Sequence, residues 1–132
     1  VMQTDIVDFY ADKNVNVVIP MSGQYSYYTD WVSENANLGG KQTWETFLTK
    51  ELPGPLEKTL KASNQRAIAG MSMTATTSLL YAEHHPGFYD AVGSFSGCAQ
   101  TSEGPALEYV RTVLSRGKAT PEEMWGPVGT ET

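Results

Sequence analysis

Three short apolar segments, separated by stretches with helical features, constrain the fold of this chain more than any other part of its sequence. They are residues 16–20, 66–69 and 91–95. The first is rich in β-branched side chains and ends at a proline, which is typical of a strand buried on both faces of a parallel sheet. Strands that alternate with helices predict an α/β protein in which helices flank a parallel sheet.

The stretches between and after these segments predict four helices and one long loop. Residues 24–40 show no hydrophobic period and are expected to form a surface loop, and a loop of this length in a compact domain usually has a function. Pro53 and Pro55 are expected to kink or break the first helix, with a further turn over residues 56–61. The proline and glycine after His85 are expected to end the second helix. The expected helices are residues 43–52, 74–84, 105–116 and 121–125.

The charge and cysteine content of the chain exclude some classes of partner. Nine Lys and Arg residues against fifteen Asp and Glu give a net charge of -6, whereas binding to a nucleic-acid backbone needs clustered cations. No basic run favours an anionic membrane surface, and the apolar stretches are far too short to span a bilayer. The single cysteine, Cys98, excludes an internal disulfide and a cysteine-based zinc cage. We therefore expect no nucleic-acid partner, no metal and no cofactor.

Residues 70–74, Gly-Met-Ser-Met-Thr, lie between the second expected strand and the second expected helix. α/β-Hydrolases place their nucleophilic serine at this point, on a sharp turn with the pattern G-x-S-x-G. The turn presents the serine oxygen at the carboxyl edge of the sheet, over a helix N-terminus whose free N–H groups favour negative charge. Here Thr74 replaces the second glycine, so the pattern is also compatible with Ser72 as an ordinary helix N-cap.

Three expected strand ends form the candidate binding crevice, because ligands of open parallel sheets bind beyond the carboxyl ends of the strands. These ends are residues 21–24, 70–73 and 96–98, and the aromatic loop that follows the first would form the rim. The loop aromatics are expected either to stack on a substrate or to pin the loop to the domain, and Cys98 and Trp125 have simple packing as their alternative role. The candidate substrate-binding residues are Ser22, Gly23, Gln24, Tyr28, Trp31, Ser96, Cys98 and Trp125.

Five segments, in order along the chain, resemble the trehalose mycolyltransferase family, which includes the mycobacterial antigen-85 proteins. The turn around Ser72 resembles the nucleophile elbow of that family, which also lacks the second glycine. Residues 74–77 and 97–100 look closer to corynebacterial members of the family. The five segments are residues 18–31, 43–53, 67–73, 85–86 and 124–127.

The resemblance implies an α/β-hydrolase fold, of which residues 1–132 would be the central part of a single domain. It also implies that Ser72 takes a mycoloyl chain from trehalose monomycolate as an acyl-enzyme, with the backbone N–H of Met73 as one oxyanion-hole donor. The acyl chain would pass to trehalose or to cell-wall arabinogalactan, in a protein that is secreted and associated with the cell envelope. The alternatives are a carboxylesterase of the same fold and a non-catalytic binding module.

A serine nucleophile needs a histidine base and an acid that orients the histidine. His84 and His85 are the two histidines of the chain, twelve and thirteen residues after Ser72 on the same expected helix, which puts them about 18 Å away. Because a hydrogen bond reaches only about 3 Å, we expect them to close the helix instead. Asp90 precedes the third expected strand, at the wrong end of the sheet. The acid and the histidine of the family lie downstream of the matching region, so we expect them beyond Thr132.

This incomplete triad predicts that the isolated 132-residue polypeptide has negligible esterase or transferase activity. Turnover of a short p-nitrophenyl ester by the isolated chain should stay at the buffer background, and Ser72→Ala should not lower it further. Robust turnover that depends on Ser72 would show that the base and the acid lie within these residues.

Overall fold

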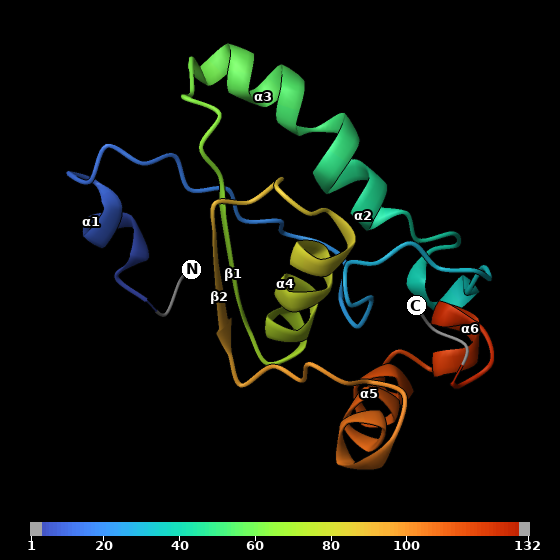
Figure 1. Cartoon of the computed structure of the whole chain (residues 1–132). Helices are drawn as coiled ribbons and strands as arrows, with labels where there is room; N and C mark the ends of the chain where they lie inside the picture. The colour runs from blue at the N-terminus through green and yellow to red at the C-terminus, as the bar shows by residue number, and fades with distance from the viewer. Residues whose placement is uncertain (1–3, 130–132) are drawn as a thin grey trace.

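The centre of the fold is a parallel pair of strands joined by a helix. The computed structural model describes residues 4–129. Strand β1 (Ala67–Met71) pairs with β2 (Ala91–Phe95), in a register that runs from Ala67 opposite Ala91 to Met71 opposite Phe95. Helix α4 (Met73–His84) makes the crossover between them and lies against the sheet (Figure 1). Parallel strands require a crossover of this kind, and the pair confirms the predicted α/β class.

The remaining elements surround this unit, and each predicted helix is present. Helix α1, near the N-terminus, is the one helix for which the sequence analysis gave no expectation. In the described residues no helix has the length and apolar character needed to cross a bilayer. The elements are α1 (Ile6–Tyr10), the 3₁₀ turn η1 (Ala36–Leu38), α2 (Trp44–Thr46), the π-helical turn η2 (Phe47–Glu51), α3 (Pro53–Leu60), α5 (Gly104–Arg116) and α6 (Pro121–Trp125).

The two prolines expected to kink or break the first long helix do not end the helical run. The helical run passes from α2 through the wide turn η2, in which Leu52 N donates to Phe47 O at 2.8 Å, and continues as α3. Pro53 stands in the first turn of α3, where a helix does not need the missing N–H group. The π-helical turn therefore places the proline at a new helix start and keeps the run continuous.

Residues 16–20 do not form the predicted strand. They have no regular secondary structure, and Val18 is 50% exposed. Within residues 4–129, β1 pairs with β2 alone, and residues 16–20 lie across a hollow from the other edge of β1. A doubly buried strand needs hydrogen-bonded neighbours about 4.8 Å away on its sheet. Without such a neighbour, the apolar pattern of this segment stays exposed.

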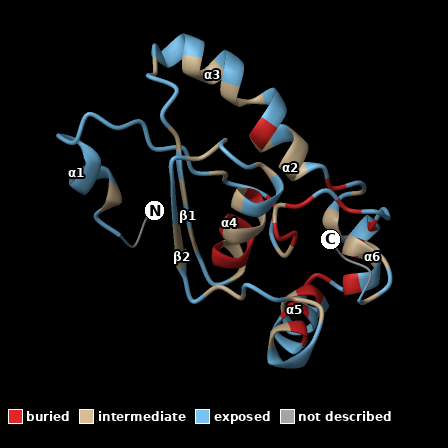
Figure 2. Cartoon of the chain, viewed as in Figure 1, coloured by how far each residue is buried: buried red, intermediate tan, exposed pale blue. Residues whose placement is uncertain are grey.

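The main hydrophobic core lies beside the sheet, around the aromatic loop that was expected at the surface. Tyr27 and Trp31 are 3% and 2% exposed and pack with buried side chains of α5 and α6. Figure 2 shows buried stretches on α5 and α6. The Trp31 indole N–H donates to Ser26 O at 2.9 Å, so its polar group is satisfied inside the core. The loop thus supplies large buried side chains, and the prediction that it lies on the surface is wrong for these residues.

Only one face of the two-stranded sheet is covered within the described residues. The face turned away from α4 carries Met71 and Phe95, which are 72% and 61% exposed. A sheet of parallel strands normally has helices on both faces, so this apolar surface is unusual for an α/β protein.

Gly70 permits the close approach of β1 and α4. A methyl group at this position would lie 2.1 Å from the carbonyl oxygen of Thr74 and 2.7 Å from the backbone nitrogen of Ala75. Both atoms belong to the first turn of α4 and cannot swing away as a side chain could. The glycine is therefore required for the tight strand-to-helix turn.

We expect Gly70→Ala to destabilise the intact protein by at least about 3 kcal/mol, the upper end of typical overpacking costs, because the new methyl group meets backbone. Gly93→Ala is the matched control on the paired strand. There the nearest atoms are side-chain carbons at 3.3 Å, so we expect a stability within about 1 kcal/mol of the wild type. Urea unfolding followed by tryptophan fluorescence measures both. Equal effects of the two substitutions would contradict this account of the turn.

Candidate active site

Ser72 occupies a strained backbone conformation at the junction of β1 and α4. Its φ and ψ angles are 57° and −117°, a combination that a residue with a side chain rarely adopts. The side chain is exposed and, in the described structure, makes no capping hydrogen bond to the helix. The ordinary N-cap alternative therefore does not hold. Strain of this kind persists at functional turns because the surrounding structure enforces it.

Thr74 takes the place of the second glycine of the hydrolase pattern and closes the turn. Its hydroxyl oxygen accepts a hydrogen bond from Met71 N and donates one to Met71 O, both at 3.0 Å. The side chain thus ties the first turn of α4 to the end of β1. The departure from G-x-S-x-G is accommodated by a hydroxyl that bonds the backbone of the turn itself.

The N-terminus of α4 lies directly behind Ser72. Met73 is the first residue of this 12-residue helix, so its N–H is one of the donors that have no partner within the helix. The helix dipole adds partial positive charge at the same place. A negative oxygen formed next to Ser72 would therefore meet a donor and a favourable field.

The end of β2 lies beside the turn, as the sequence predicts. Met71 and Phe95 are partners in the register, so Ser72 and Ser96 are the next residue on each strand. Ser72 N donates to Phe95 O at 2.9 Å, which fixes the two strand ends together. Ser96 is exposed and Cys98 half-buried. Ser72, Ser96 and Cys98 thus come together at the carboxyl edge of the sheet.

Residues 21–24 face a hollow of their own. Ser22, Gly23 and Gln24 line a separate hollow of about 470 Å³, together with the end of α5 at Arg116 and with Trp44. Ser72 is not among its lining residues. The expectation that residues 21–24 share one crevice with Ser72 stays a prediction.

The aromatic candidates are all held by packing and hydrogen bonds. The Tyr28 hydroxyl donates to Ser22 O, and Tyr28 O accepts from the Tyr81 hydroxyl. The Trp125 indole N–H donates to Thr29 Oγ1 at 3.0 Å. Trp31 lies in the core. These contacts pin the aromatic loop to the domain.

Two hydroxyl side chains that the sequence analysis did not single out fasten the β2 end to α4. Ser94 Oγ donates to Ala75 O at 3.0 Å, and Thr76 Oγ1 accepts from Cys98 N at 3.0 Å. Tyr27 lies close by, and burial together with the nearby Cys98 raises the pKa of its hydroxyl to about 12. A threonine such as Thr76, in the first helical turn after the elbow serine, is the signal that could have indicated these hydrogen bonds between α4 and the end of β2.

The histidines lie at the far end of α4, where the sequence places them. His84 Nδ1 and His85 Nε2 lie 2.9 Å and 2.8 Å from the same carboxylate oxygen of Glu45, and His85 follows the last residue of the helix. Asp90 accepts a hydrogen bond from Arg66 N at 2.8 Å, at the amino edge of the sheet. These three groups hold helix and strand ends in place, away from Ser72.

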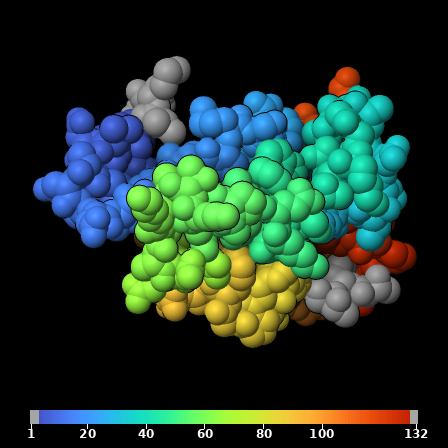
Figure 3. Space-filling view, turned by 90° about the horizontal axis from the view of Figure 1, so that it is seen from above, coloured from blue at the N-terminus to red at the C-terminus, as the bar shows by residue number. Residues whose placement is uncertain are grey.

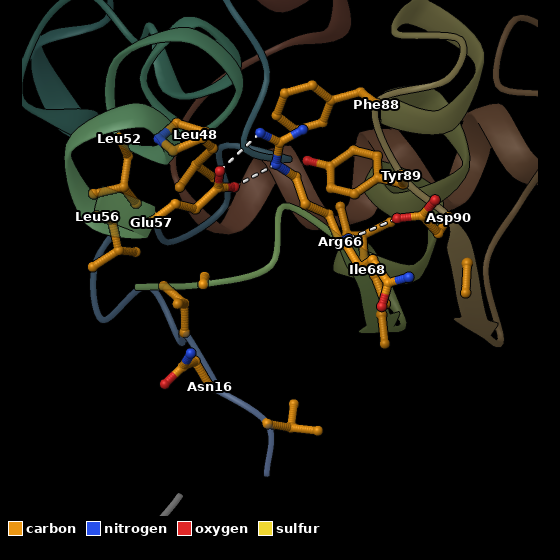
Figure 4. A pocket seen from close by; sticks show the side chains of 18 of the residues that line it. Asn16, Leu48, Leu52, Leu56, Glu57, Arg66, Ile68, Phe88, Tyr89 and Asp90 are labelled. Atoms are coloured by element: carbon orange, nitrogen blue, oxygen red, sulfur yellow. Dashed lines mark hydrogen bonds and ion pairs between the residues drawn. The ribbon is translucent and has the colours of Figure 1, made fainter. Parts of the chain in front are cut away.

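A larger hollow, of about 1140 Å³, runs along β1 from Arg66 and Asp90 to Thr74 of α4 (Figure 4). Leucines of the α2–α3 run form one wall, with Ile68 of β1 and residues 14–20 on the other sides. Seen from above, the α3 region lies against the N-terminal segment and the end of α4 (Figure 3). No pattern in the sequence predicts this hollow.

An ion pair crosses this hollow between α3 and β1. Arg66 donates two hydrogen bonds to the Glu57 carboxylate, from Nη2 to Oε2 at 2.9 Å and from Nε to Oε1. The guanidinium carbon of Arg66 also lies 4.3 Å from the centre of the Phe88 ring. The hydrogen bond from Arg66 lowers the pKa of the Glu57 carboxyl. The pair therefore links the α3 end to the strand that carries the elbow.

We expect this ion pair to make stability depend on pH. A carboxyl whose pKa is lowered by folding stabilises the protein above its ordinary pKa of about 4.3, and this contribution is lost as pH falls through the lowered value. The difference in unfolding free energy between wild type and Glu57→Gln should therefore be present at neutral pH and shrink in acid. Glu108→Gln, which removes an exposed i,i+3 pair with Arg111, is the control and should show little difference at any pH. A pH-independent effect of Glu57→Gln would contradict the assignment.

Comparison with known proteins places this geometry in context. The whole chain, residues 1–132, matches the family described as "Putative esterase". It is 37% identical over 132 residues to the diacylglycerol acyltransferase/mycolyltransferase Ag85A of Mycobacterium leprae (strain TN), an alignment that covers 96% of this chain and 39% of that relative. The Ag85B protein of the same organism is 33% identical over 131 residues, with 96% and 40% covered. Ag85A of Mycobacterium tuberculosis (strain ATCC 25618 / H37Rv) is 36% identical, with 96% and 38% covered. The chain thus spans about two fifths of the length of these relatives.

Proposed function

Because the chain belongs to the putative esterase family, we propose that it carries the nucleophile of a serine acyltransferase of the mycolyl type. The observation that carries the proposal is the strained, exposed Ser72 at the β1–α4 junction, whose side chain does not cap the helix. The similarity to mycolyltransferases extends over 96% of the chain and includes this turn.

The proposed reaction has two acyl-transfer steps. Ser72 Oγ attacks the ester carbonyl of the donor and forms a new ester, while the donor sugar leaves as an alcohol that takes up a proton. The hydroxyl of the acceptor then attacks this acyl-enzyme and releases Ser72. In both steps the carbonyl oxygen becomes negative, and the Met73 N–H at the N-terminus of α4 is the proposed donor to it.

The donor that the similarity favours is a trehalose mycolate glycolipid, and the acceptor is trehalose or cell-wall arabinogalactan. The relatives are described as diacylglycerol acyltransferase/mycolyltransferases, which supports a long-chain acyl group. Such a substrate belongs to the cell envelope, so we propose a secreted protein that acts there. Ser96 and Cys98, next to Ser72, are the proposed substrate contacts at the carboxyl edge, and Ser22, Gly23 and Gln24 are further candidates.

We further propose that residues 1–132 are the central part of a larger α/β-hydrolase domain, whose other portions supply the triad acid and histidine. The chain covers about two fifths of its relatives. The uncovered sheet face at Met71 and Phe95, and the exposed apolar residues 17–19 beside the hollow, also support a larger domain, since such surfaces are normally buried.

Hydrolysis of the acyl-enzyme by water is the second candidate function. The family description, "Putative esterase", favours it. The nucleophile and the first step are the same, and the two functions differ in whether a sugar hydroxyl or water takes the acyl group.

We expect a fluorophosphonate probe to label the intact protein covalently, and Ser72→Ala to abolish the labelling, because only an activated serine reacts. Mass spectrometry of the labelled peptide identifies the modified residue. Product analysis with a trehalose ester then separates transfer to trehalose from release of the free acid. Absence of labelling in the intact, folded protein would favour a non-catalytic binding module.

A further inference from the structure

Two neighbouring serines at the carboxyl edge of the sheet are held in unfavourable backbone conformations. The φ angle is 57° at Ser72 and 64° at Ser96, and both residues directly follow paired strand ends. Non-glycine residues in this region are strained, and such strain persists only where several contacts enforce it. The contacts that hold these two turns therefore determine where the Ser72 hydroxyl lies.

Three hydrogen bonds join the end of β2 to the turn that carries Ser72. One is between backbone groups, Ser72 N to Phe95 O at 2.9 Å. The other two involve side chains, Ser94 Oγ to Ala75 O and Cys98 N to Thr76 Oγ1, each at 3.0 Å. Of the three groups at the end of β2, Cys98 N comes last in the chain. Its hydrogen bond to Thr76 Oγ1 therefore fixes the segment from Ser96 to Cys98, which follows the backbone bond at Phe95.

Gly97 shows how closely this segment lies on α4. A methyl group there would come within 2.7 Å of the Ala75 carbonyl carbon and 2.4 Å of Ser94 Oγ. The segment therefore has little freedom while the Thr76 bond holds. Without that bond, Cys98 N loses its acceptor and the strained Ser96 turn can relax away from the helix.

We propose that Thr76 is a positioning residue for acyl transfer at Ser72. Its hydroxyl holds residues 96–98 against the first turn of α4, and through Phe95 O it keeps the Ser72 turn in its reactive conformation. Thr76 is only 4% exposed and is buried beneath the site, so it acts through the backbone and does not touch substrate. The proposal rests on the proposed function, because it assumes that Ser72 is the nucleophile.

Thr77 is a matched control on the same helix. It is also 4% exposed, and its hydroxyl lies 2.5 Å from Tyr27 O of the core loop and 3.2 Å from Met73 O, so it holds the core loop instead of residues 96–98. Thr76→Val and Thr77→Val both remove one buried hydroxyl with little change in shape. The two variants should lose similar thermal stability, and only the first should disturb the Ser72 turn.

The test uses the intact protein and measures the second-order rate of fluorophosphonate labelling, kcat and KM for a p-nitrophenyl ester, and the melting temperature. We expect Thr76→Val to slow labelling and lower kcat by about tenfold, since small misplacements of a nucleophile have effects of this size or larger. KM should change little. Thr76→Ser keeps the acceptor oxygen and should restore most of the rate, whereas Thr77→Val should label at close to the wild-type rate.

Three results would overturn the proposal. Labelling of Thr76→Val at the wild-type rate would show that the bond does not matter for Ser72, and an equal loss in Thr77→Val would show a general effect of destabilisation. Failure of Thr76→Ser to recover would assign the effect to the methyl group instead of the hydroxyl. A wild-type protein that is not labelled at all, or a Ser72→Ala variant that still is, would refute the proposed function itself and is thereby distinguished from these outcomes.

Discussion

The close contact between β1 and the first turn of α4 is the constraint on which the rest of the site depends. The contact is possible because Gly70 has no side chain, and it forces the chain to reverse within a single residue, Ser72. Ser72 carries the backbone strain and is exposed to solvent, and Met73, which provides the next backbone N–H, is the first residue of the helix. A single steric condition thus produces an exposed hydroxyl, a free donor and a favourable dipole at one point.

Hydroxyl side chains then stabilise a geometry that the backbone alone would not keep. Thr74 bonds both backbone groups of Met71, while Ser94 and Thr76 bind the end of β2 to the helix. The buried Thr76 hydroxyl needs its partner in place, because an unpaired buried polar group is costly. The small residues of α4 therefore have two roles, since they allow close packing on the sheet and supply hydrogen bonds to its edge.

The sequence allowed prediction of the elements whose signals are local. The β1–α4–β2 unit was predicted with its ends almost in place, because Gly70 and the His85–Pro86–Gly87 stretch mark the boundaries by their backbone preferences. Residues 16–20 were predicted wrongly, because their pattern describes a strand that requires neighbours which β1 and β2 do not provide. The burial of Trp31, the continuation of the helix through Pro53 and the roles of Ser94 and Thr76 depend on which distant segments meet. Neither hydrophobic periodicity nor turn residues in the sequence indicate which distant segments come into contact.

The pair of imidazoles on Glu45 has a mechanical consequence for the site. Glu45 belongs to α2, which Asp30 also binds through Thr46 N at 3.1 Å and Thr46 Oγ1 at 2.5 Å. The carboxyl end of α4 is therefore hydrogen-bonded to α2, the helix that follows the aromatic core loop, while its amino end is hydrogen-bonded to the end of β2. Helix α4 is therefore held at both ends, and these attachments limit how far it can tilt relative to the Ser72 turn.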